Sequence, residues 1–286
     1  MSAIRLGTRA STLATTQSEM VARLLRSEGL DVDLTTITTH GDTSTASLAA
    51  MGGIGVFASA IRATLLKGEA DIAVHSFKDL PTGRPLGLAI GAVPARADPR
   101  DALVARDGLT LHDLPQEASV GTGSPRRAAQ LLAVRPDLTI VDIRGNVDTR
   151  LGRVKGLGHY AKGGGKEDLD AVVLAASGLA RLGHSGTVTE FLDPSVVLPA
   201  PAQGALAVEC RTADSRHGKL AKALARIDDR RTRLAATAER AVLSHLEAGC
   251  AAPIGALAQL KPVSGSSPQV LTLDVVVATV DGSRII

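Results

Sequence analysis

The sequence is poor in aromatic side chains, because its 286 residues include no Trp, one Tyr and three Phe. Proteins that bind single-stranded nucleic acid stack bases on aromatic rings and follow the backbone with dense basic runs. This chain has few rings and no dense basic run. We therefore expect no nucleic-acid partner.

Cysteine is almost as scarce, with only Cys210 and Cys250 in the chain. Two cysteines in a cytosolic protein favour free thiols over a disulfide. Cys210 follows an apolar run and is expected to be a buried packing residue, whereas small neighbours in the sequence EAGCAAP leave the Cys250 sulfur accessible. The seven His and two Cys show no metal-binding spacing, so we expect no metal site.

Long apolar runs are also missing, and the first residues lack the basic start and apolar stretch of a secretory signal. We therefore expect a cytoplasmic protein without a membrane partner. The length and the 44% hydrophobic content are sufficient for two or three ordinary domains.

Short β-like runs alternate with helical patterns through most of the first 210 residues. This alternation is typical of parallel sheets covered by helices and predicts an α/β fold. Strands are expected at residues 4–8, 32–38, 71–76, 119–121, 138–143, 171–174 and 204–209. Helices are expected after Ser11, over residues 56–67, from Pro125 and after Asn146.

Two stretches of turn residues, at 93–101 and 198–201, indicate crossovers between the same two α/β units, which would enclose a cleft. After residue 214 the pattern changes to two helices followed by strands and a hairpin turn at 281–282. The predicted domains are residues 1–96 with 198–213, then 97–197, then 214–286. Because the chain ends as it returns from the turn, we expect the third domain to be incomplete, with one face of the strand at 270–280 uncovered.

Most of the basic residues are arginines, with 24 Arg against eight Lys. Three segments share a strand, a polar turn, an Arg and a helix start: residues 8–11, 121–127 and 144–150. A helix N-terminus already carries partial positive charge, so an added Arg costs roughly a few tenths of a kcal/mol unless an anion lies between them. We infer a pocket for several anionic groups; the open alternative is that these arginines point to solvent.

The segment HSFKD at 75–79 places a carboxylate beside a cation where a predicted strand ends. A neighbouring cation keeps Asp79 ionised, which suits a group that stabilises positive charge or moves a proton. The alternative is an ordinary surface ion pair.

In order along the chain, six segments resemble motifs of the porphobilinogen deaminases (hydroxymethylbilane synthases): RLGTR at 5–9, HSFKD at 75–79, VGTGSPRR at 120–127, RGNVDTR at 144–150, LPAPAQG at 198–204 and EAGC at 247–250. The resemblance covers nearly the whole chain. It implies two α/β domains built like periplasmic binding proteins around a cleft, plus a smaller α+β domain. It also implies a dipyrromethane cofactor attached to Cys250 through a thioether.

The implied activity is that of a transferase in tetrapyrrole and haem biosynthesis, acting as a monomer. It joins four porphobilinogen molecules stepwise on the dipyrromethane and releases hydroxymethylbilane and ammonia. By resemblance, Asp79 is the catalytic carboxylate. The implied cofactor contacts are Ser76, Lys78, Asp79, Thr122, Ser124, Arg126, Arg127 and Arg144. The implied substrate contacts are Arg9, Ser11, Gln17 and Arg150.

The chain departs from the family pattern in a few places. Ala50 and Ile54 stand where the family commonly has lysines, Gly123 replaces a usual Ser, and the loop around Gly163 is longer than usual. Two alternatives stay open at this point: a non-catalytic anion-binding protein of the periplasmic-binding type, and an inactive or truncated homologue.

Overall fold

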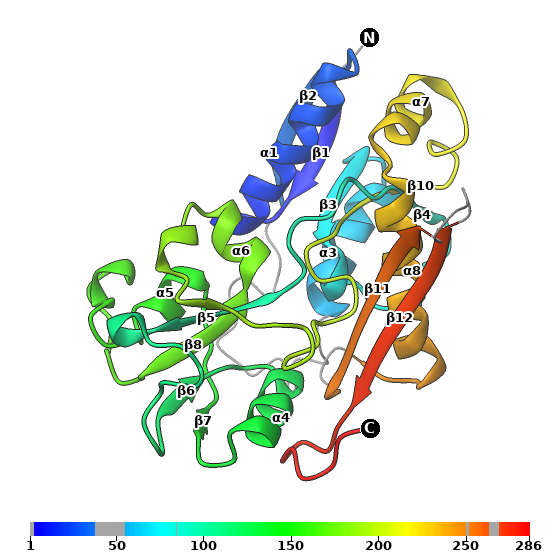
Figure 1. Ribbon diagram of the computed structural model, residues 1–286. Coiled ribbons are helices and arrows are strands. Elements are labelled where there is room, and N and C mark those ends of the chain that lie inside the picture. The colour runs from blue at the N-terminus through cyan, green and yellow to red at the C-terminus, as the bar shows by residue number, and fades with distance from the viewer. Residues whose placement is uncertain (1–2, 38–54, 84, 250–251, 263–268) are drawn as a thin grey trace. The chain divides into compact units, whose positions relative to one another are not determined.

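The computed structural model describes residues 3–37, 55–83, 85–249, 252–262 and 269–286 (Figure 1). The chain divides into two compact units. The first contains Met1–Ala97 and Ala205–Ser244, and the second contains Asp98–Gly204 and His245–Ile286. Each unit has its own sheet and its own hydrophobic core.

The first unit is built on a five-stranded sheet in the order β2-β1-β3-β10-β4. Its strands are β1 (Ile4–Thr8), β2 (Val32–Thr36), β3 (Ile72–Ser76), β4 (Leu88–Ala92) and β10 (Leu206–Arg211). β1 is parallel to β2 and β3, whereas β10 is antiparallel to both of its neighbours. β10 pairs with β3 on one side and β4 on the other, which confirms that the chain returns to the first sheet.

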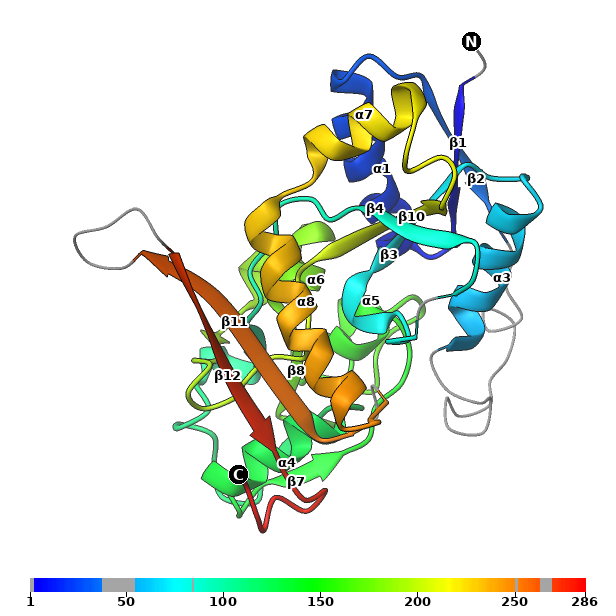
Figure 2. The same ribbon diagram turned by 90° about the vertical axis from the view of Figure 1, so that its right-hand side faces the viewer.

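The described residues of this unit include the α-helices α1 (Thr12–Ser27), α3 (Gly55–Leu66), α7 (Gly218–Ile227) and α8 (Arg230–His245). Ser11 begins α1 as predicted, since its Oγ accepts a hydrogen bond of 3.3 Å from the Ala14 amide. α7 lies beside α1 and β4 (Figure 2).

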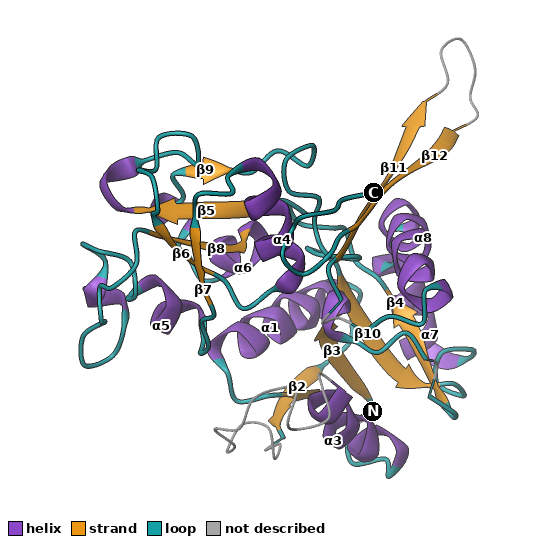
Figure 3. Cartoon of the chain, turned by 90° about the horizontal axis from the view of Figure 1, so that it is seen from below, coloured by secondary structure: helices purple, strands orange, loops and turns teal. Residues whose placement is uncertain are grey.

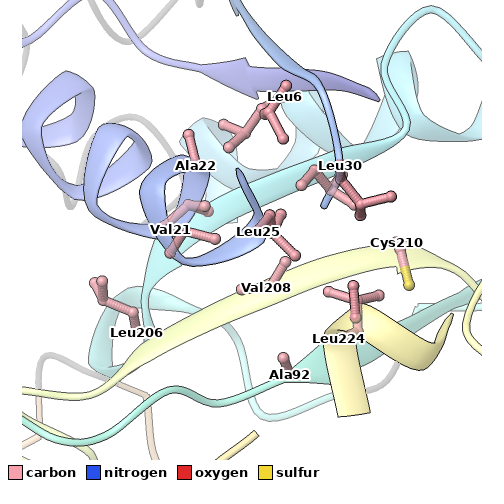
Figure 4. Close-up of a cluster of buried hydrophobic side chains, with 14 residues drawn as sticks. Leu6, Val21, Ala22, Leu25, Leu30, Ala92, Leu206, Val208, Cys210 and Leu224 are labelled. Atoms are coloured by element: carbon pink, nitrogen blue, oxygen red, sulfur yellow. The ribbon is translucent and has the colours of Figure 1, made fainter. Parts of the chain in front are cut away.

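The core of the first unit joins α1, α7 and the sheet (Figure 4). Val21 and Leu25 from α1 pack in one cluster with Leu6 from β1 and Leu224 from α7. Cys210 lies fully buried in the same cluster, which confirms its expected packing role.

The second unit has a related sheet, β7-β6-β8-β5-β9, in which β5, its first strand along the chain, takes the position that β10, the last strand, has in the first sheet. Its strands are β5 (Asp101–Ala105), β6 (Ser119–Gly121), β7 (Thr139–Val141), β8 (Ala171–Ala175) and β9 (Glu190–Phe191), and its helices include α4 (Pro125–Val134), α5 (Val147–Leu151) and α6 (Ala176–Arg181). β6 is parallel to β7 and β8, and β5 is antiparallel to β8 and β9. The predicted α/β class is confirmed in both units.

A two-stranded hairpin of β11 (Ile254–Pro262) and β12 (Gln269–Val277) completes the described chain (Figure 3). Four apolar side chains of β12 that alternate along the strand are 36–41% exposed: Leu271, Leu273, Val275 and Val277. The expected uncovered apolar face is therefore confirmed. The turn at 281–282 is also confirmed, because Ala278 pairs with Ile285 beyond it.

Within the described residues, no helix has the length and apolar character needed to cross a bilayer.

Candidate functional site

The segment that carries Asp79 is a single 3₁₀ turn, Phe77–Asp79, directly after β3. Phe77, the first residue of the turn, and Leu80, which follows the turn, are buried, whereas Asp79 between them is exposed. The buried residues anchor the turn and leave the carboxylate at the carboxyl end of a central strand. Ligands of α/β sheets bind at this end of the strands.

Two predicted site residues meet beside this turn. Gln17, which α1 buries against the sheet, places its Nε2 3.0 Å and its Oε1 3.2 Å from the Ser76 hydroxyl. Arg9 and Ser11 lie at the start of the same helix, where the Thr15 hydroxyl donates to the Arg9 carbonyl at 3.4 Å. The first unit thus brings the predicted substrate contacts Arg9, Ser11 and Gln17 to one helix that touches β3.

Arg126 and Arg127 open α4 in the second unit, and they do not point to solvent. They are only 3% and 6% exposed, and both pair with the fully buried Asp101 of β5. Arg127 donates to Asp101 Oδ1 at 2.7 and 3.0 Å, and Arg126 Nη2 lies 2.8 Å from Oδ2. The solvent alternative is wrong for these two arginines, because the chain supplies an anion to them.

Other donors of the two arginines go to main-chain carbonyls. Arg126 Nη1 donates to Leu198 at 2.6 Å, and Arg127 Nη1 donates to Val173 at 3.0 Å. Arg126 Nε is buried and has no hydrogen-bond partner among the residues that the structure describes. One buried donor of this cluster therefore lacks a partner within the described part of the chain.

The charges of this cluster do not balance, since two guanidinium groups face one carboxylate. Burial alone would raise the pKa of Asp101, but the charges of Arg126 and Arg127 outweigh it and hold that pKa well below its usual range. Burial, together with the charge of Arg127, lowers the pKa of Arg126 although Asp101 opposes the shift. An additional anion would relieve this excess of buried positive charge.

Gln203 joins this cluster and Arg181 contacts the residue that follows Gln203, and the sequence alone indicated neither residue. Gln203 Nε2 donates to Asp101 Oδ1 at 2.8 Å. Arg181, at the end of α6, donates from Nη2 to the carbonyl of the adjacent Gly204 at 2.6 Å. Burial lowers the pKa of Arg181 to about 10, and its Nε has no hydrogen-bond partner in the described chain. Arg181 is thus a third, partly buried cation of the second unit suited to an anionic ligand.

The remaining predicted residues of the second unit lie near the surface. Thr122 is the exception: it is buried, and its hydroxyl accepts from the Ser124 amide at 3.2 Å. Ser124 occupies the N-cap position of α4, but its side chain makes no capping hydrogen bond. Arg144 is half-exposed and pairs with Asp142 at 3.1 Å, and Arg150 Nε donates to the Gly145 carbonyl at 2.9 Å.

Gly123, one of the departures noted above, has a steric explanation. A Cβ atom at this position would lie 2.7 Å from the carbonyl oxygen of Ile143, so a serine requires the two segments to move apart. Cys250, Ala50 and Ile54 lie outside the described residues.

We expect Asp101→Asn to lower the free energy of unfolding by about 3–5 kcal/mol, because the change leaves two buried guanidinium groups without a counter-charge. Asp137→Asn is the matched control. Its carboxylate pairs with Arg135 at a partly exposed site, where loss costs about 1 kcal/mol or less. Urea unfolding measures both, and equal losses would contradict the proposed charge balance.

The difference in the free energy of unfolding between the parent protein and Asp101→Asn should depend on pH. The pKa of Asp101 is lower in the folded protein than its ordinary value of 3.8, so the stabilisation is complete above that value. It should fade as the pH falls below 3.8 toward the folded pKa. The parent protein and Asp101→Asn should therefore converge in stability in acid, as measured by urea unfolding across this range.

Comparisons with known proteins cover almost the whole chain. Residues 4–219 match the family model "Porphobilinogen deaminase, dipyromethane cofactor binding domain", and residues 233–286 match "Porphobilinogen deaminase, C-terminal domain". A porphobilinogen deaminase of Cutibacterium acnes is 96% identical over 284 residues, which are 99% of this chain and 85% of that protein. A porphobilinogen deaminase of Micrococcus luteus is 54% identical over 100% of this chain and 81% of its own length.

Among solved structures, the chain is similar to a periplasmic substrate-binding protein of an ABC transporter from Coxiella burnetii. The TM-score is 0.47 at 16% identity, over 83% of this chain and 95% of that one. A nutrient binding protein from Burkholderia cenocepacia bound to methionine gives a TM-score of 0.44 at 16% identity, over 78% and 91% of the two chains.

Proposed function

The chain belongs to the porphobilinogen deaminase family, and on that basis we propose a role for each group of residues in its candidate site. The reaction is that of hydroxymethylbilane synthase in tetrapyrrole biosynthesis. Four molecules of porphobilinogen are joined into the linear tetrapyrrole hydroxymethylbilane, with release of ammonia.

Asp79 is the catalytic carboxylate of this proposal. As the aminomethyl group of porphobilinogen loses ammonia, positive charge develops on the pyrrole nitrogen, and a fixed carboxylate stabilises it. The exposed position of Asp79 between two buried anchors supports this role. Arg9, Ser11, Gln17 and Arg150 bind the carboxylates of the incoming substrate, for which arginine supplies paired donors.

The buried cations of the second unit fit the dipyrromethane cofactor, whose acetate and propionate groups are anionic. The observation that carries this proposal is the excess of positive charge: Arg126 and Arg127 are both buried against one carboxylate, Asp101. When bound, the dipyrromethane supplies the pyrrole terminus to which the substrate units are joined. Its proposed attachment is a thioether to Cys250. The proposed non-covalent contacts are Ser76, Lys78, Asp79, Thr122, Ser124, Arg126, Arg127, Arg144 and, from the structure, Arg181.

The finer organisation of the molecule is also a proposal. The three domains are residues 1–96 with 198–213, 97–197 and 214–286. The related arrangement of the two five-stranded sheets, each with its fourth strand antiparallel to both neighbours, supports a common, periplasmic-binding-protein-like architecture for the first two. A monomer that acts in the cytoplasm, without a nucleic-acid or membrane partner, completes the proposal.

Arg181→Leu tests the proposed contacts with the cofactor. A lost charged hydrogen bond weakens binding by about 1.5–3 kcal/mol. Because the cofactor is then fixed covalently, weaker binding slows its capture; in a short incubation of apoprotein with porphobilinogen, we expect less than about a tenth as many chains of the variant as of the parent to gain the mass of two pyrrole units. Intact-mass spectrometry gives these fractions directly.

The matched control is Arg135→Leu. Arg135 also donates to main-chain carbonyls, those of Leu111 and Leu114, but it pairs with Asp137 outside the buried cluster. This control should load the cofactor as the parent does. Full loading of the Arg181 variant would show that the buried charge of Arg181 does not hold the cofactor.

A further inference from the structure

The turn that carries Asp79 makes few hydrogen bonds of its own. The Leu80 amide closes it by donating to the Phe77 carbonyl at 3.3 Å, and the Phe77 amide donates to Ala205 in the neighbouring segment at 3.0 Å. The next residue, Pro81, has no amide hydrogen to donate. Such a short turn needs a contact from another element to keep one conformation.

Arg240 of α8 makes this contact. Its Nη1 donates to the carbonyls of Phe77 and Leu80, both at 2.9 Å, and its Nη2 donates to the Pro81 carbonyl at 2.7 Å. The guanidinium carbon also lies 4.6 Å from the centroid of the Phe77 ring, in a cation–π contact. One side chain therefore binds the turn at three carbonyls on both sides of Asp79.

The helix that presents Arg240 is itself attached firmly to the same unit. Glu239, the preceding residue, is fully buried and accepts from Arg96 at 2.6 and 3.0 Å. At the other end of α8, the Asp229 amide donates to the Val93 carbonyl at 2.8 Å. Arg240 thus holds the turn in place relative to α8, which is itself fixed to the rest of the unit.

We propose that Arg240 is a positioning residue for the reaction, which holds the main chain of residues 77–81 and thereby keeps the Asp79 carboxylate in one place. The proposal rests on the proposed role of Asp79. The same carboxylate serves four successive additions, so it must occupy the same position in each. A displacement of about 1 Å in a reacting group can reduce the rate roughly a hundredfold. The guanidinium donates to these carbonyls from two nitrogens held apart in one plane, whereas the three donors of a lysine ammonium all leave a single nitrogen and cannot reproduce this spacing.

The test compares Arg240→Gln and Arg240→Lys with Arg233→Gln. Arg233 is a matched control because it lies on the same helix and also reaches carbonyls, those of Ile90 and Gly91 at 3.3–3.4 Å, but none in the Asp79 turn. We expect Arg240→Gln to lower kcat at least about tenfold and to change KM for porphobilinogen less than about twofold. Arg240→Lys should fall between this variant and the parent, and Arg233→Gln should keep the parent kcat.

Two readouts separate positioning from a general loss of structure. Both glutamine variants should retain the full dipyrromethane mass, and hydrogen exchange at the Leu80 amide should accelerate only when Arg240 is replaced. A kcat for Arg240→Gln equal to that of Arg233→Gln would overturn the proposal. If the glutamine variant does not fold, Arg240→Lys decides the question, and a parent-like kcat for it would overturn the proposal equally.

A failure of the positioning role of Arg240 can be distinguished from a failure of the catalytic role of Asp79. If replacement of Asp79 left the activity intact, the role of Asp79 would be wrong whatever Arg240 does. If replacement of Asp79 abolished activity while the Arg240 variants matched the Arg233 control, only the positioning role would be wrong. In an Asp79→Glu background, the loss caused by Arg240→Gln should be smaller than in the parent, because the displaced carboxylate depends less on the turn.

Discussion

The Cys250→Ser protein should fold normally, carry no dipyrromethane and form no hydroxymethylbilane. The thiolate is the nucleophile in thioether formation, and a serine hydroxyl is far weaker at neutral pH. The attachment must also persist while four substrate units are joined and the product is released. Intact mass should show the loss of the two-pyrrole increment, and an aldehyde reagent for pyrroles should no longer colour the protein.

Cys210→Ser is the control for this experiment. Burial raises the pKa of the Cys210 thiol to about 11, so this sulfur stays protonated and out of contact with reagents. The variant should keep its cofactor and its activity, and it should lose about 1–2 kcal/mol of stability, because a hydroxyl replaces sulfur in the core. Loss of colour in the Cys210 variant with retention in the Cys250 variant would reverse the assignment.

Asp79→Ala should abolish tetrapyrrole formation and leave the protein folded. The side chain is exposed, so its removal costs little packing, whereas loss of a group that stabilises developing charge typically reduces kcat by about a hundredfold or more. Asp79→Glu should retain part of the activity, because it keeps the charge and moves it by one methylene.

Product formation from porphobilinogen and urea unfolding should be measured on both variants. Asp113→Ala provides a control at another exposed carboxylate, which bonds to Thr110 on the surface of the second unit. An Asp79→Ala protein that formed product near the parent rate would show that Asp79 is only part of a surface ion pair.

Local patterns in the sequence were sufficient to predict many elements. The strands at 4–8 and 119–121 have the predicted bounds, and the helix from Pro125 begins where expected. β5 was not predicted, because its first residue, Asp101, resembled one more charge in a turn-rich stretch. Asp101 is instead buried, and only its pairing with two arginines from a distant helix makes that burial possible.

The candidate site shows the same division between local and long-range information. The arginines at the start of α4 indicated a pocket for several anionic groups; the structure shows them paired with the chain's own Asp101, and the pocket for an anionic ligand stays a prediction. Arg181 and Arg240 lie in ordinary helical patterns, and their roles depend on carbonyl groups far away in the sequence. No periodicity or spacing could have distinguished them from arginines at the surface.

The strand order of the first unit also constrains when this protein can fold during synthesis. β3 and β4 follow one another in the chain, yet they are joined in the sheet only through β10, which is made more than a hundred residues after β4. All strands of the second sheet are present once β9 has been translated. The first sheet stays incomplete until β10 is made, and until then β3 and β4 each have an unpaired edge. A nascent chain that stalls before residue 206 would thus expose those edges, so we expect the first unit to depend more on chaperones than the second.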